Sequence, residues 1–242
     1  MTAAIKQMLL IIHKTCGDVS NPIFRYYNTC EKDKNKKPIY DLLADSFLTL
    51  YGYTMLIFNH SWSQAFCLLR LAIEQVAKLS ILLICDGACS DYVSLRKECY
   101  EYELMSKNEK KQFKKDKQIA NSKTNDYFEY SWIKYYTKDG SYGRNQMLDL
   151  AQLNELKDDY KFLNKFVHGT LSIFELNKDN WSILNRFVTR YNLVCCKLYD
   201  YLCSYSRLFL LMNPLSFTMN QTFRTFRSIY EFVLTAKVDC SK

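Results

Sequence analysis

The chain has 242 residues, of which 48% are hydrophobic and 24% are charged, and its formal net charge is +8. This composition is typical of a folded soluble protein with a sizeable core. Glycine and proline number only six and three, which argues against many strands joined by tight turns and favours long helices. We therefore predict an all-α fold, built as a single helical bundle with long C-terminal helices.

The first helix is predicted over residues 2–14. Its short apolar run is interrupted by Lys6 and has no clear small-residue cleavage site, so we predict no secretory signal and a cytoplasmic protein. The ten cysteines are then expected to be free thiols, as is usual in a reducing compartment. Cys85 and Cys89 form a lone CxxxC pair with no histidine nearby, and we predict neither a metal site nor a cofactor.

A lysine-rich stretch, EKDKNKKP at residues 31–38, reads as a loop. We predict an N-terminal region over 1–37, formed by the first helix and this loop, followed by a bundle over 38–242. No later change in composition marks another boundary. The first helix of the bundle is expected to begin near Pro38, because the first turn of a helix does not use the N–H that proline lacks.

The next helix, QAFCLLRLAIEQVAKLSILLIC, is the most apolar part of the chain, and Arg70, Glu74 and Lys78 recur along it at four-residue spacing. At 100° per residue they occupy a stripe about 80° wide. Three charges in so short a segment argue against a membrane span, and we predict no membrane partner. Two interpretations remain open: a local salt bridge facing water, or a partly buried polar group placed for a function.

After a shorter helix near residues 92–105, the segment KNEKKQFKKDKQIANSK holds seven lysines and few apolar residues. One interpretation is a solvated helix or a mobile lid. The other is a cationic guide for RNA phosphates, with Lys111, Lys114 and Lys115 as contacts.

The helix predicted over 145–168, broken near Leu150, ends at the sequence HG. Gly169 suits the left-handed turn that closes a helix. Lys161, Asn164, Lys165 and His168 fall within an arc of about 100° on the helical wheel, opposite the apolar residues. His168 is then either a cation that stabilises the helix end or part of a polar face that meets RNA or a second subunit, where imidazole can transfer protons.

The last third is predicted to form two long helices, over 179–212 and 215–236, separated near Pro214. Their many aromatic residues are spaced as in a helix core. Arg186 and Arg190 lie one turn apart among them, and base stacking or a dimer face is the alternative to a core.

Several of these segments occur in an order that resembles an uncharacterised branch of HEPN-like (higher eukaryotes and prokaryotes nucleotide-binding) proteins. They are AFCLLRLAIEQVAKL, YSWIKYY, a GS loop, LDLAQL and YKFLNKFVHGT, and the resemblance covers residues 45–170. It implies an all-α bundle. In many such relatives it also implies a metal-independent endoribonuclease of a toxin or defence system, in which two subunits form a composite site.

By this resemblance His168 matches the family histidine, the proton shuttle. The family arginine precedes that histidine by a few residues, but here Lys161, Phe162 and Leu163 stand at those positions, and lysine lacks the planar fork of arginine. The resemblance thus assigns catalysis to His168 with Lys161 or Arg70 as the phosphate-stabilising cation, Glu74 orienting Arg70, and Asn164 assisting; Lys165 is an expected RNA contact. The implied partners are RNA, a second copy as homodimer, and a partner protein or antitoxin. The alternative is a catalytically inactive module that binds RNA or protein.

Overall fold

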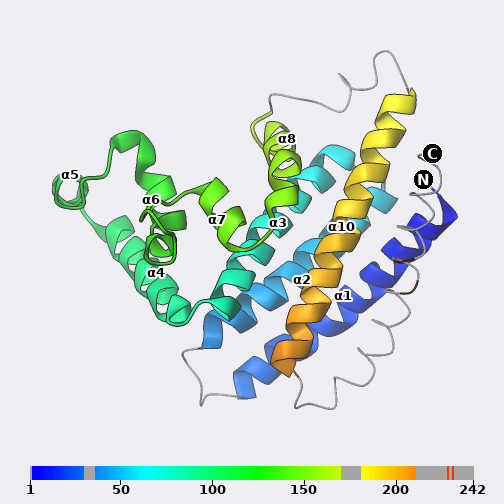
Figure 1. The fold of residues 1–242 in the computed structure, drawn as a ribbon, viewed down its shortest axis with the longest axis horizontal. Helices are drawn as coiled ribbons and strands as arrows, with labels where there is room; N and C mark the ends of the chain where they lie inside the picture. Colours follow the sequence, from blue (N-terminus) through cyan, green and yellow to red (C-terminus); the bar gives the residue numbers. More distant parts are fainter. Residues whose placement is uncertain (1, 30–35, 170–180, 211–227, 229–230, 232–242) are drawn as a thin grey trace. The chain divides into compact units, whose positions relative to one another are not determined.

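The computed structural model describes residues 2–29, 36–169 and 181–210, together with the single positions 228 and 231. Within these ranges every regular element is helical, which confirms the predicted all-α fold (Figure 1). None of the described helices is long and apolar enough to cross a membrane. The predicted helix over 215–236 lies outside the described residues.

The chain divides into two compact units, and the predicted N-terminal region over 1–37 stays a prediction. Unit 1 comprises Met1–Glu31, Tyr40–Val76 and Asp158–Lys242, and unit 2 comprises Lys32–Ile39 and Ala77–Lys157. The N-terminal helix belongs to unit 1 because it packs against the C-terminal helix of the described chain. Tertiary packing, and not position along the chain, therefore sets the division.

Unit 1 contains α1 (Ala3–Thr29), α2 (Lys37–Phe58), the first part of α3 (Trp62–Ile84), α8 (Lys157–Val167) and α10 (Trp181–Leu210). The Tyr53 hydroxyl on α2 donates a hydrogen bond to Asn192 Oδ1 on α10 at 2.7 Å. On α3, the Phe66 ring lies 5.1 Å from both Phe166 and Tyr191. Burial of these large side chains is the main contribution to the stability of the unit.

Helix α1 continues well beyond the predicted end at Lys14, through a helical glycine. A Cβ atom at Gly17 would lie 3.2 Å from Cε2 of Tyr51. The missing side chain thus lets the α1 backbone approach this ring on α2. The neighbouring His13 ring stacks on Tyr51 at 4.5 Å, so contacts with α2 support this part of α1 although glycine disfavours a helix.

Unit 2 contains the end of α3, then α4 (Ala88–Leu104), α5 (Lys107–Asp116), α6 (Thr124–Tyr130) and α7 (Arg144–Leu150), with short 3₁₀ turns between them. These turns are η2 (Asn121–Lys123), η3 (Ser131–Tyr135) and η4 (Asn154–Leu156). The predicted interruption near Leu150 is confirmed. The Tyr136 hydroxyl donates to Asp91 Oδ2 at 2.6 Å, and it ties the η3 turn to α4.

Candidate functional site

The stripe predicted on α3 is largely buried: Arg70 and Glu74 pair with each other, whereas Lys78 pairs with a residue of another helix. Arg70 Nη1 lies 3.0 Å from Glu74 Oε2, and the two side chains are 18% and 7% exposed. Lys78 Nζ lies 2.6 Å from Glu129 Oε2 on α6, within unit 2. The stripe is therefore not a local salt bridge facing water, and the interpretation of a partly buried polar group is the one that the structure supports.

Tyr160 on α8 completes the group around Arg70. Its hydroxyl donates a hydrogen bond to Glu74 Oε2 at 3.2 Å, and the Arg70 guanidinium carbon lies 5.0 Å from the centroid of its ring. Glu74 thus accepts from two side chains while Arg70 also gains a cation–π contact. Tyr160 lies on the apolar side of its helical wheel, and its hydrogen bond to Glu74 was not predicted from the sequence. The partner carboxylate is 86 residues away in the chain.

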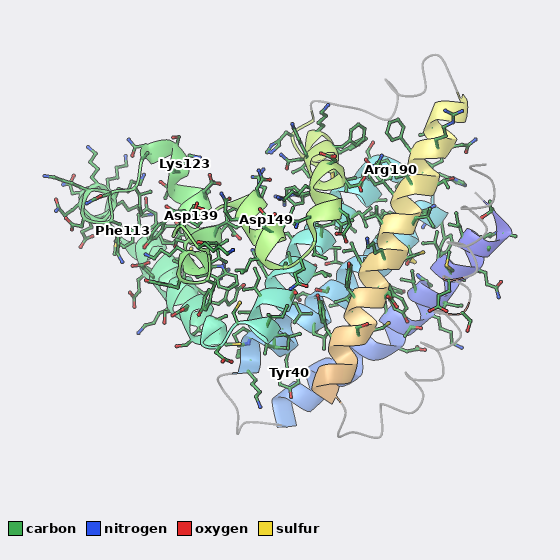
Figure 2. All side chains as sticks on the ribbon, viewed as in Figure 1. Tyr40, Phe113, Lys123, Asp139, Asp149 and Arg190 are labelled. Atoms are coloured by element: carbon green, nitrogen blue, oxygen red, sulfur yellow. The ribbon has the colours of Figure 1, made fainter. Side chains whose placement is uncertain are left out.

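The apolar face of α8 packs inside unit 1, and this packing places the Tyr160 ring beside Arg70. Tyr160, Leu163 and Phe166 are buried, and Phe166 contacts Phe66 one turn before Arg70 on α3. The two helices therefore run antiparallel within unit 1. The Arg190 guanidinium on α10 adds an ion pair to Asp159 Oδ1 at 2.7 Å (Figure 2).

Two polar atoms of this region are buried without a hydrogen-bond partner among the described residues. They are Nε of Arg70 and Oδ1 of Asn164. An unsatisfied buried group costs about 1–3 kcal/mol. We call Arg70, Glu74 and Tyr160 the α3–α8 cluster; it includes two of the five residues predicted to act in catalysis.

Of the other three, Asn164 is half-buried on α8, and His168 and Lys161 are exposed. His168 follows the last residue of α8, and its amide donates to the Asn164 carbonyl at 3.2 Å. Eight residues separate it from Tyr160, which is about 12 Å along a helix. No side-chain hydrogen bond or ion pair joins His168 or Lys161 to another described residue. Gly169 has φ of 63°, which confirms the predicted left-handed turn.

The predicted RNA contacts Lys111, Lys114 and Lys115 lie on α5, which is a regular helix with no buried residue. Together with Lys107 they fall within an arc of about 100°, while Glu109 and Asp116 lie on the opposite side. Lys107, Lys111 and Lys115 have no acidic partner in the described chain, and Lys114 donates only to Asn121 Oδ1 at 3.4 Å. We call these four residues the α5 lysine face. Lys165, on α8 in unit 1, lies over the Phe162 ring.

Helix α5 is held in place by a capped N-terminus and one aromatic side chain. The Ser106 hydroxyl accepts from the Glu109 amide, and the Glu109 carboxylate accepts from the Ser106 amide. Phe113, labelled in Figure 2, has ring centroids 5.2 Å from Tyr102 and 5.9 Å from Phe128. This anchor fixes the side of the helix that faces unit 2 and leaves the lysines in solvent.

Other chemistry is not assembled in the described part of the chain. No three residues among His, Cys, Asp and Glu lie together as metal ligands there. Burial raises the pKa of the Cys16 and Cys195 thiols well above the ordinary value, so neither is a thiolate nucleophile at neutral pH. Comparison with protein-family models, curated proteins and solved structures gives no match to this chain.

Proposed function

We propose that this protein is a catalytically inactive helical module that binds RNA through the α5 lysine face. The observation that carries the proposal is the segregation of charge on α5: four lysines share one exposed arc, and the two carboxylates lie on the other side. A solvated helix without a partner gains nothing from such segregation, since mixed charges support a helix through neighbouring pairs. Unpaired lysines on one arc fit a polyanion, from which they displace counterions.

The arrangement of the α3–α8 cluster supports binding over cleavage. In the nuclease hypothesis, an arginine and His168 act on the same phosphate. Arg70 is instead engaged by Glu74 and by the Tyr160 ring, whereas His168 lies about two helical turns further along α8. Cleavage by His168, with Lys161 or a second subunit, stays a prediction, as do the HEPN-like resemblance, the cytoplasmic location and the toxin or defence role.

The proposal is tested with a fluorescein-labelled single-stranded RNA and anisotropy measured over a series of salt concentrations. Replacing Lys107, Lys111 and Lys115 by glutamine should weaken binding and reduce the slope of log K against log salt by about 2, because each phosphate contact contributes roughly 0.7. The matched control replaces Lys6, Lys14 and Lys138, three exposed lysines elsewhere, and changes the net charge equally. Equal slopes for the two triple variants would overturn the assignment to α5.

The same RNA, incubated with the protein in EDTA, separates binding from cleavage. We expect intact RNA with both the wild type and His168→Ala. Cleavage by the wild type that is lost in His168→Ala would establish the nuclease hypothesis and overturn the inactive module.

A further inference from the structure

Helix α4 carries apolar residues on two opposite faces, and only one of them is covered within unit 2. Ala88, Leu95 and Tyr102 are buried, where α4 packs against α6 and the η3 turn (Figure 1). About 180° away around the helix, Val93, Tyr100 and Leu104 are 45%, 68% and 71% exposed. Single exposed apolar residues are ordinary, but three on one stripe indicate an interaction surface.

The exposed stripe has the spacing of a helix-pairing seam. Val93, Lys97, Tyr100 and Leu104 follow at intervals of four, three and four residues, and all lie within an arc of about 60°. Such alternation of three and four keeps a seam facing one partner helix. The Lys97 side chain is 77% exposed, and its contact with Glu101 is a distant one at 3.8 Å, so it is available to a partner.

We propose that this stripe is the contact between two copies of the chain, with the two α4 helices paired antiparallel about a two-fold axis. An axis midway between Lys97 and Tyr100 places Val93 opposite the partner's Leu104 and Lys97 opposite the partner's Tyr100. The outer layers are then apolar, and the two inner layers each pair an ammonium group with an aromatic ring. The stripe is thus complementary to its own reversed copy, as an isologous interface requires.

Charges beside the stripe agree with the same pairing. A two-fold axis perpendicular to both helices brings each flank against the same flank of the partner. Arg96 and Glu103 share one flank, about 20° apart around the helix. The dimer therefore contains two equivalent pairs, each between Arg96 of one copy and Glu103 of the other. Their side chains are 54% and 69% exposed, and their intrachain ion pairs are long, at 3.9 Å to Glu129 and 3.5 Å to Lys110. Both groups are free to reorient toward the partner.

The seam from Val93 to Leu104 is short, about 16 Å along the helix, so the dimer is weak and concentration-dependent. Sedimentation velocity from about 5 to 200 µM protein should show a monomer–dimer equilibrium. Tyr100→Lys should abolish it, because it places a second ammonium group opposite Lys97 in each inner layer. Tyr135→Lys is the control, since Tyr135 is equally exposed in the same unit (66%) but lies off α4.

A charge exchange identifies the orientation. Arg96→Glu alone and Glu103→Arg alone should each weaken dimerisation by about tenfold, because each places two like-charged pairs in the interface. The double variant should restore it to within about threefold of the wild type. A monomer at all concentrations, equal effects of Tyr100→Lys and Tyr135→Lys, or no recovery in the double variant would overturn the proposal. The readout is association, so it is independent of RNA binding.

Discussion

The Tyr160 hydroxyl donates its hydrogen bond to a carboxylate of Glu74 that is also paired with Arg70, so one buried oxygen joins α8 to two turns of α3. This junction supports the position of α8 in unit 1. It also means that the charges of Arg70 and Glu74 compensate each other within the fold, where either one alone would be poorly solvated.

We expect Arg70→Met to lower the free energy of unfolding by about 2–3 kcal/mol at neutral pH, since it leaves Glu74 buried without its cation. Urea unfolding of Arg70→Met, Glu74→Gln and the double variant should give a coupling energy of about 1–3 kcal/mol. The matched control is Lys97–Glu101, which has the same spacing but exposed side chains (77% and 55%), and whose coupling should be a few tenths of a kcal/mol. Equal coupling in the two cycles would contradict a structural role for the buried pair.

Phe113→Ala should release α5 from unit 2, because no residue of this ten-residue helix is buried and so short a helix is marginal in water. Hydrogen exchange should then show the α5 amides losing protection while those of α4 keep it. Phe113→Leu retains an apolar anchor and serves as control. Unchanged protection in Phe113→Ala would show that the contacts of Lys110 with Glu103 and of Lys117 with Glu98 hold the helix without the aromatic anchor.

Gly169→Ala should destabilise the protein by about 1 kcal/mol, because alanine adopts the left-handed conformation at a cost. Its φ is 63°, and no atom lies within 4 Å of a Cβ built there, so the effect is conformational and not steric. Gly169→Asn should cost less, since asparagine tolerates this region. Thermal melting of the two variants gives the comparison; the same loss for both would argue against this explanation.

The free energy of unfolding should fall at alkaline pH. Burial raises the pKa of the Cys195 and Cys196 thiols above the ordinary value of 9.0. As pH rises through that value the unfolded chain releases these protons first and binds fewer than the folded chain. The contribution of the two thiols to stability is therefore constant below about pH 8 and declines above it.

Each such thiol contributes a loss of about 1.4 kcal/mol for every pH unit above its unfolded pKa. Denaturant titrations at pH 8 and pH 10 should therefore show a smaller loss in the variant with both Cys195 and Cys196 replaced by alanine than in the wild type. An equal loss would mean that other groups, such as the buried tyrosines, account for the whole decline.

Local patterns were sufficient for much of the fold. The apolar spacing of α3 and α8, the interruption near Leu150 and the turn at Gly169 depend on neighbours in the chain, and these predictions are confirmed. The end of α1 was predicted too early, at Lys14. Gly17 lies against the Tyr51 ring of another helix, and this contact is one that no local pattern contains.

Some properties of the candidate sites also follow from local patterns, and others depend on tertiary contacts. The sequence by itself determined that α5 is cationic, that Arg70 and Glu74 share a helical face, and that His168 ends its helix, since each depends on spacing along one helix. Only the tertiary structure decided that Glu74 is buried under Tyr160, that Lys78 pairs with Glu129 instead, and that one apolar stripe of α4 stays in solvent. The physical reason is that burial and charge pairing depend on which helices pack together, and packing joins residues far apart in the chain.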